Sequence, residues 1–234
     1  MFGLKIFTPG LIPTACLLCR AETDHPGVLC RDCFLDLPVI RNGCVLCGAP
    51  VFEDPLCGAC IRRPPRLDRT IAACLYSYPV DALIQRFKYD QKLWAASPLV
   101  TCLLEKINSE AVCLPDVLLP VPLHRRRLYL RGYNQSREIC RILSRHLSIP
   151  VDEEAVHRLR HTPEQSRLTA AQRRKNVRGA FRARPGVDYR SVAIVDDVVT
   201  TAATANEITK ILKQAGVERV ELWALARAVS GNLR

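Results

Sequence analysis

Four Cys-x-x-Cys pairs lie within the first 60 residues and restrict what this part of the chain can fold into. The pairs are separated by ten, ten and nine residues, and they are Cys16/Cys19, Cys30/Cys33, Cys44/Cys47 and Cys57/Cys60. A Cys-x-x-Cys turn directs two thiolates at one ion, and two such turns complete a tetrahedral four-cysteine site for zinc. We therefore expect two structural Zn²⁺ ions, and their ligation has to stabilise a segment with few large apolar residues.

The spacing leaves open which pairs share an ion. Sequential pairing, first with second and third with fourth, gives two zinc ribbons and is favoured; a cross-braced arrangement would join first with third and second with fourth. A disulfide framework belongs to small secreted chains. Nothing here indicates secretion, because Pro9 and Pro13 interrupt the apolar start. No apolar run approaches the roughly 18 to 20 residues of a spanning helix, so we expect a cytoplasmic protein without membrane insertion.

The run Arg62 to Arg66 contains two adjacent prolines and is typical of an extended linker. We place a domain boundary there, with a double zinc ribbon over 1–66 and a second domain over 67–234. In the second domain apolar patterns alternate between strand and helix periods. Strands are expected at 71–78, 117–121, 191–195 and 220–226, and helices within 80–105, 134–147 and 204–214. This order predicts a doubly wound α/β fold with a parallel sheet.

The segment Ser191 to Ala205 places two adjacent acids after a buried strand and before a Thr/Ala loop that opens a helix. An open parallel sheet binds its ligands at this point. The loop and the helix N-terminus would present N–H groups and threonine hydroxyls to a phosphate. Asp196 and Asp197 would repel that phosphate, so we expect their carboxylates to accept hydrogen bonds from vicinal sugar hydroxyls, with a divalent metal ion nearby. Together these groups describe a phosphorylated ribose.

Residues 192–204 resemble the signature of type I phosphoribosyltransferases, which is four apolar residues, two acids, two apolar residues and a Thr/Gly-rich loop. The resemblance implies binding of 5-phosphoribosyl 1-pyrophosphate (PRPP) with Mg²⁺, with Asp196 and Asp197 as the catalytic acids. The residues implied to bind PRPP are Asp196, Asp197, Thr200, Thr201, Ala202, Ala203 and Thr204. Most such loops carry Gly where this chain has Ala202. Because alanine disfavours a positive φ, phosphate binding is expected to be weakened or altered.

The resemblance extends over nearly the whole chain to the ComF/GntX family of competence-associated, phosphoribosyltransferase-like proteins. Besides the cysteine pairs, the matching segments are 83–89 (LIQRFKY), 120–123 (PVPL), 131–136 (RGYNQS) and 162–168 (TPEQSRL), with Arg173, Asn176 and Phe181. The strand end at 120–127 carries three consecutive arginines, which suits a pyrophosphate. By family analogy it is the pyrophosphate loop, with Arg125 and Arg126 as ligands and Lys88 reaching the same anion from a neighbouring helix. Residues 158–184 resemble the flexible lid of such sites.

The net charge of +11 is concentrated in two segments. Residues 121–146 hold seven Lys/Arg against one Asp/Glu, and residues 158–184 hold nine against one. This predicts a patch that faces anionic partners. Three functions stay open. The favoured one is PRPP binding in DNA uptake, with transfer of phosphoribose to an unidentified acceptor; the alternative is a non-catalytic single-stranded DNA handling protein regulated by PRPP. The third is an adaptor that docks through its ribbons, for example on other DNA-uptake proteins.

Overall fold

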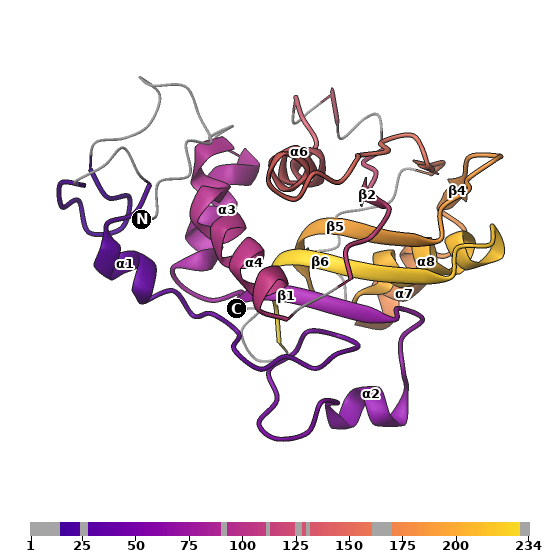
Figure 1. Ribbon diagram of the computed structural model, residues 1–234, viewed down its shortest axis with the longest axis horizontal. Helices are drawn as coiled ribbons and strands as arrows, with labels where there is room; N and C mark the ends of the chain where they lie inside the picture. Colours follow the sequence, from indigo (N-terminus) through magenta and orange to yellow (C-terminus); the bar gives the residue numbers. More distant parts are fainter. Residues whose placement is uncertain are drawn as a thin grey trace.

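The computed structural model describes residues 15–23, 28–89, 93–110, 113–124, 128–129, 132–160 and 170–229. At its centre is a four-stranded sheet with the strand order β1-β6-β5-β2 (Figure 1). Every pairing in this sheet is parallel. The strands are β1 (Arg69–Leu75), β2 (Val117–Pro120), β5 (Ser191–Val199) and β6 (Arg219–Arg227). The four expected strands are thus present, within a few residues of their expected bounds.

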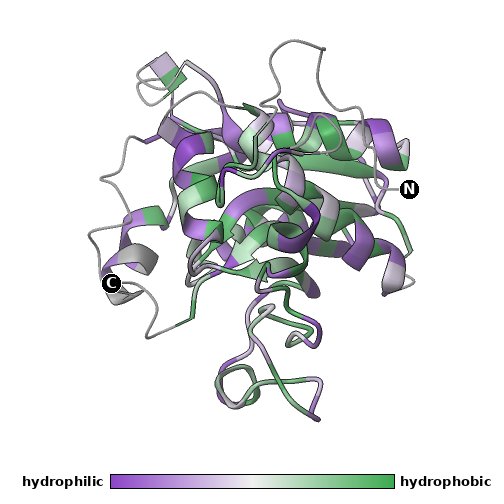
Figure 2. Ribbon diagram, turned by 90° about the vertical axis from the view of Figure 1, so that its left-hand side faces the viewer, coloured by the Kyte–Doolittle hydropathy of each residue, from purple (hydrophilic) through white to green (hydrophobic). Residues whose placement is uncertain are grey.

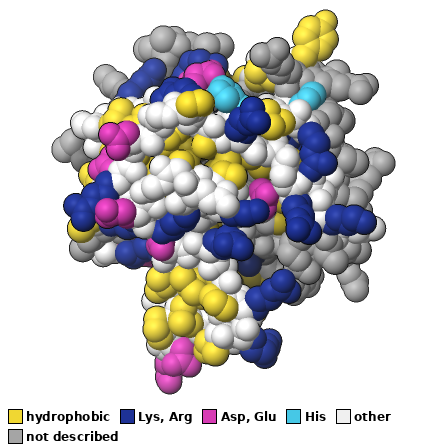
Figure 3. Space-filling view, turned by 90° about the vertical axis from the view of Figure 1, so that its right-hand side faces the viewer, with side chains coloured by type: hydrophobic (Ala, Val, Ile, Leu, Met, Phe, Trp, Pro, Cys, Tyr) yellow, Lys and Arg dark blue, Asp and Glu magenta, His cyan; other side chains and the backbone are white. Residues whose placement is uncertain are grey.

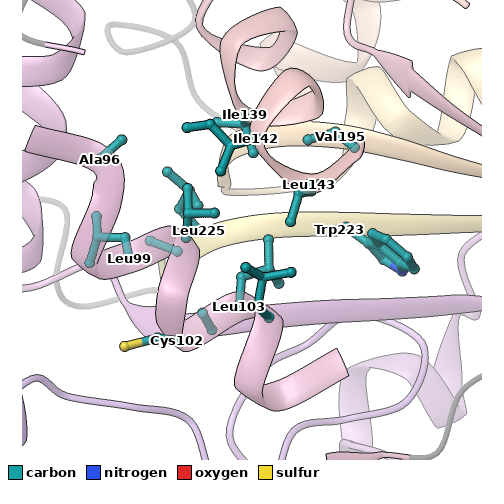
Figure 4. Packing of buried hydrophobic residues seen from close by; sticks show 14 of the residues in the cluster. Ala96, Leu99, Cys102, Leu103, Ile139, Ile142, Leu143, Val195, Trp223 and Leu225 are labelled. Carbon is teal, nitrogen blue, oxygen red and sulfur yellow. The ribbon is translucent and has the colours of Figure 1, made fainter. Parts of the chain in front are cut away.

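Helices cover both faces of the sheet. On one face lie α3 (Val80–Tyr89), the 3-10 helix η1 (Leu93–Ala96), α4 (Ser97–Ser109) and α6 (Gln135–Leu147). Their side chains form one core with Trp223 and Leu225 of β6, as Figure 4 shows for Leu99, Leu103 and Leu143. A second core on the opposite face contains residues of α7 (Ala170–Val177) and α8 (Ala203–Gln214). These two layers confirm the doubly wound α/β fold.

Burial on both faces explains the composition of the central strands. All nine residues of β6 except the terminal Arg219 and Arg227 are buried, as expected for a parallel strand covered by helices on each side. In Figure 2 the hydrophobic colour runs along the strands, whereas the helices carry both hydrophobic and hydrophilic residues. Pro98 stands at the start of α4, where a missing N–H group costs no intrahelical hydrogen bond. Pro98 is therefore compatible with α4.

The cysteine-rich segment contains two short helices, α1 (Arg31–Leu35) and α2 (Gly58–Arg62). Between them the chain runs along β1: Val39 forms an antiparallel bridge with Cys74, and the Ile40 N–H donates to the Ala73 carbonyl at 2.8 Å. A separate antiparallel pair is formed by β3 (Val156–Arg158) and β4 (Phe181–Ala183). The domain boundary between residues 66 and 67 stays a prediction.

Candidate functional site

The eight paired cysteines form two clusters, each with its four sulfur atoms within 4.8 Å of one another. One cluster is Cys16, Cys19, Cys30 and Cys33, and the other is Cys44, Cys47, Cys57 and Cys60. The Sγ atoms of Cys19 and Cys30 are 3.6 Å apart, and those of Cys47 and Cys57 are 3.7 Å apart. Zn–S bonds of about 2.3 Å in a tetrahedron require sulfur separations of about 3.8 Å, far longer than a disulfide bond. The sequential pairing of the cysteines is confirmed, and the donors fit zinc.

Backbone N–H groups favour the thiolate form of one cysteine in each cluster. Burial alone would raise the pKa of the Cys44 thiol, but N–H groups of Cys57, Cys47 and Leu46 lower it to about 7. The Cys57 N–H lies 3.3 Å from the Cys44 sulfur. In the same way, donors on Cys19, Cys30 and Leu18 outweigh burial and lower the pKa of Cys16 to about 6. Because zinc binds the thiolate, Cys44 and Cys16 are prepared for the metal, whereas burial raises the pKa of the Cys33 and Cys60 thiols.

The two acids lie inside β5, which continues to Val199 and not only to Val195 as expected. The strand is prolonged because β6 continues alongside it, with Asp196 opposite Ala224 and Val198 opposite Ala226. β2 ends beside the same point, since Pro120 pairs with Val195. The acid pair therefore sits at the carboxyl end of the parallel sheet, where ligands bind in open α/β folds.

Lys88 on α3 is held by the acid pair. Its ammonium lies 2.9 Å from Asp197 Oδ1, and both side chains are largely buried. Burial would lower the pKa of Lys88, but the carboxylates of Asp197 and Asp196 raise it above its ordinary value. The predicted contact of Lys88 with a pyrophosphate stays a prediction; in this structure its partner is Asp197.

The carboxyl group of Asp196 has a perturbed pKa. Burial, and then the charge of Asp197, raise the pKa of Asp196 to about 7 against the opposing effect of Lys88. Its Oδ1 accepts hydrogen bonds from the Asp197 N–H at 2.9 Å and from Ser136 Oγ at 3.3 Å. Carboxylate oxygens suit Mg²⁺, so the pair fits the expected ion once Asp196 has lost its proton.

The loop after β5 has features of an anion site. Ala202 adopts the left-handed conformation, with φ of 50°, which is the conformation that alanine was expected to disfavour. Ala203 and Thr204 lie in the first turn of α8, and in the described part of the chain no side chain caps this helix terminus. Among the described residues, the Thr201 hydroxyl is buried without a hydrogen-bond partner. A buried donor without a partner beside an uncapped helix N-terminus suits a phosphate oxygen.

Some predicted site residues belong to parts of the chain that the structure does not describe. Arg125 and Arg126 fall outside the described residues. The segment 158–184, expected as a flexible lid, is anchored at both ends: β3 pairs with β4, and α7 and β4 pack against α8. Residues 161–169 lie outside the description.

Sequence reasoning did not select two residues that the structure places at the site. Ser136 contacts Asp196 from the start of α6, and its position after the N-cap Asn134 could have indicated this. Arg227, at the end of β6, donates to the Thr200 carbonyl at 2.5 Å. A charged residue that ends an apolar strand is a weak signal, and no sequence pattern indicated this contact.

Similar proteins have been named for DNA-related roles. The chain is 36% identical over 225 residues to the DNA utilization protein YhgH of Escherichia coli K12, which covers 93% of this chain and 99% of that protein. It is also 36% identical over 222 residues to competence protein F of Haemophilus influenzae, which covers 91% of this chain and 96% of that protein. The chain belongs to the ComF family. The expected family is therefore confirmed over almost the full length.

Two family models match separate parts of the chain. A double zinc ribbon domain matches residues 8–61, and a phosphoribosyl transferase domain matches residues 134–234. The second match includes the acid pair and the loop that follows it. This family member thus combines a zinc ribbon module with a phosphoribosyltransferase domain.

Solved structures with some similarity include an amidotransferase and a phosphoribosyltransferase. The glutamine PRPP amidotransferase of B. subtilis is 20% identical, with a TM-score of 0.37, over 57% of this chain and 27% of that chain. The adenine phosphoribosyltransferase of Leishmania tarentolae is 13% identical, with a TM-score of 0.36, over 64% of this chain and 74% of that chain.

Among the described residues, no helix is both long and apolar enough to cross a membrane.

Proposed function

We propose that this chain binds PRPP together with Mg²⁺ at the carboxyl end of β5, and that it does so in DNA uptake or utilization. The buried Thr201 hydroxyl carries the proposal, because it has no partner among the described residues and lies beside the uncapped start of α8. A 5′-phosphate at the start of α8 would satisfy this hydroxyl and lie at the positive end of the helix dipole. The names of the relatives in E. coli and H. influenzae support the biological setting.

The acid pair is suited to the ribose. Its carboxylates would accept hydrogen bonds from the two sugar hydroxyls, and Lys88 reduces the repulsion between this acidic pair and the anionic ligand. Mg²⁺, when bound, would neutralise charge on the pyrophosphate.

The thiolates required by both zinc clusters favour a reducing compartment, which supports a cytoplasmic location.

Isothermal titration of the zinc-loaded protein with PRPP, with and without Mg²⁺, tests the proposal. We expect Mg²⁺-dependent binding that is lost in the double variant Asp196→Asn/Asp197→Asn. Thr201→Val should weaken binding about fivefold, the effect of about 1 kcal/mol expected for one hydrogen bond. Thr209→Val is the matched control, since it removes a buried hydroxyl of α8 that already donates to the Ala205 carbonyl. Absence of PRPP binding by the unaltered protein would contradict the proposal.

Bound PRPP would also be the donor in phosphoribosyl transfer. The bond between the anomeric carbon and pyrophosphate breaks, pyrophosphate leaves with the electron pair, and an acceptor nucleophile bonds to the carbon and loses a proton. Pyrophosphate release in the presence of candidate acceptors, with the double variant as the blank, measures this step. Release that is equal in the two proteins would exclude the acid pair from it.

A basic surface favours single-stranded DNA handling as a second candidate. On the side of the molecule that carries β4, α7 and α8, Lys and Arg side chains are spread over the surface (Figure 3). The exposed ones in this part of the chain include Arg160, Lys175, Arg178 and Arg182. If they contact phosphates, strand binding should weaken steeply with added salt, whereas docking through the ribbons should not. Equal affinity for an oligonucleotide at low and high salt would exclude this surface.

A further inference from the structure

The cluster of Cys44, Cys47, Cys57 and Cys60 is called the second cluster, and the loop at Thr200–Thr204 is called the phosphate loop. Hydrogen bonds connect the two. Three successive carbonyls of the turn between Cys44 and Cys47 accept from the strands of the sheet. The Val45 carbonyl accepts from the Thr70 N–H at 2.7 Å, and the Leu46 carbonyl accepts from Thr70 Oγ1 at 2.8 Å. The Cys47 carbonyl accepts from Arg227 Nε at 2.8 Å. The zinc turn is thereby fixed in position against β1 and β6.

Arg227 makes the connection from there to the loop. The guanidinium donates through Nε to the Cys47 carbonyl. Through Nη1 it also donates to the Thr200 carbonyl at 2.5 Å and to the Val199 carbonyl at 3.2 Å. A guanidinium is planar and rigid, so the positions of its donors are fixed relative to one another. Displacement of the Cys47 carbonyl therefore has to alter the contacts at Thr200.

A second contact joins the same two regions. The Arg66 N–H, four residues beyond the end of α2, donates to Asn206 Oδ1 at 2.7 Å. The Asn206 N–H in turn donates to the carbonyl of Ala202 at 2.8 Å. The phosphate loop is thus held from both ends of the segment that contains the second cluster.

We propose that Arg227 is a positioning residue through which zinc at Cys44, Cys47, Cys57 and Cys60 sets the geometry, and so the anion affinity, of the loop at Thr200–Thr204. The identity of the anion rests on the proposed function, but the mechanical coupling does not. Coupling between two sites is reciprocal. Zinc at the second cluster strengthens PRPP binding, and bound PRPP raises the affinity of that cluster for zinc by the same factor.

Amide hydrogen exchange over residues 199–206, measured on the zinc-loaded full chain without any ligand, tests the coupling directly. Arg227→Gln should retain two zinc ions and exchange about tenfold faster in this segment, the scale of a typical coupling between sites. Arg227→Lys should behave similarly, because one ammonium group cannot span the Cys47 and Thr200 carbonyls. Arg219→Gln is the matched control: this arginine of the same strand donates to the Cys113 and Leu114 carbonyls instead, and its loss should leave the segment unchanged.

Removal of zinc from one cluster at a time gives an independent test. Cys57→Ser and Cys30→Ser are matched, because both half-buried ligands are the N-caps of short helices. Exchange in residues 199–206 should accelerate in Cys57→Ser and not in Cys30→Ser. Unchanged exchange in Arg227→Gln, or an equal effect of the two cysteine variants, would overturn the coupling.

PRPP titration of the same proteins separates the two proposals. If the unaltered protein binds PRPP, Arg227→Gln should bind it about tenfold more weakly, and saturating PRPP should raise the chelator concentration needed to remove zinc at equilibrium from the second cluster only. If the unaltered protein binds no PRPP, the proposed function fails, and hydrogen exchange alone still decides whether Arg227 couples the cluster to the loop.

Discussion

The two zinc clusters have the same ligands and spacing, yet they are attached to the rest of the molecule by different interactions. Residues beside the first cluster contribute apolar side chains to the core under α3 and α4, with Val28 and Leu37 buried and Phe34 packed against them. The second cluster is joined by hydrogen bonds from Thr70 and Arg227 to its backbone carbonyls. Apolar contacts tolerate small shifts, whereas hydrogen bonds require fixed directions. The second cluster can therefore transmit its geometry to the loop, and the first mainly contributes burial.

Loss of a zinc ligand should have the largest effect and should separate the two clusters. Cys16→Ser and Cys44→Ser remove matched buried ligands, at 1% and 0% exposure. Each should release one ion, and structural zinc contributes on the order of 10 kcal/mol to the folding of small zinc modules. We expect the melting temperature to fall further in Cys44→Ser, because that cluster is tied to β1 and β6. Zinc content and thermal unfolding check this, and a larger fall in Cys16→Ser would reverse the comparison.

The apolar and the polar attachment can be weakened separately. Leu37→Ala should cost about 2 to 5 kcal/mol, the usual range for a truncated core leucine. Thr70→Val removes only the hydroxyl that donates to the Leu46 carbonyl and should cost about 1 kcal/mol. Chemical denaturation measures both free energies of unfolding. If Thr70→Val lowered the free energy of unfolding more than Leu37→Ala does, hydrogen bonds would be the stronger attachment.

The charge state of Asp196 should make PRPP binding depend on pH, independently of the clusters. The group faces Asp197 on its own strand, Lys88 on α3 and Ser136 on α6. Its pKa is raised to about 7, so the folded protein holds this proton more tightly than the unfolded chain. The stability that this proton provides is complete below about pH 4 and is lost as the pH rises through about 7.

PRPP affinity should increase as the pH rises, whereas stability decreases. The reason is that the ligand and Mg²⁺ prefer the ionised carboxylate. Between pH 6 and pH 7 we expect affinity to rise several-fold, approaching a plateau above the pKa of about 7. Calorimetric titrations across this range should show the rise in the unaltered protein. Asp196→Asn should show a flat profile, and an equally steep profile in that variant would assign the dependence to another group.

Ala202→Gly should have the smallest effect on stability. It also tests whether backbone strain at this position contributes to the coupling between the second cluster and the loop. Alanine at a φ of 50° is strained, and the left-handed conformation costs an L-residue about 1 kcal/mol. Glycine removes this strain but adds flexibility to the unfolded chain. We expect a change in stability below about 1 kcal/mol, and PRPP binding that is less sensitive to loss of zinc at Cys57. Equal sensitivity with and without the substitution would show that the strain is unrelated to the coupling.

Local patterns allowed much of this structure to be predicted. The Cys-x-x-Cys spacing indicated two zinc clusters, and the alternation of strand and helix periods indicated the parallel sheet, because both depend on residues close in sequence. The ion pair of Lys88 with Asp197 and the hydrogen bond of Ser136 to Asp196 join residues separated by 109 and 60 positions. Such contacts depend on how α3 and α6 pack on β5, which no local pattern contains. Arg227 is missed for the same reason.

The run of chain along β1 has a consequence for the solubility of the protein. β1 is an outer strand of the sheet, and its open side is paired by Pro38, Ile40 and Val45, which lie between or within the two zinc clusters. An uncovered outer strand offers unpaired N–H and C=O groups to any other extended chain and promotes aggregation. Zinc binding that holds this segment against β1 should therefore also protect the sheet from self-association. Zinc starvation should appear first as loss of protein from the soluble fraction, before any ligand is added.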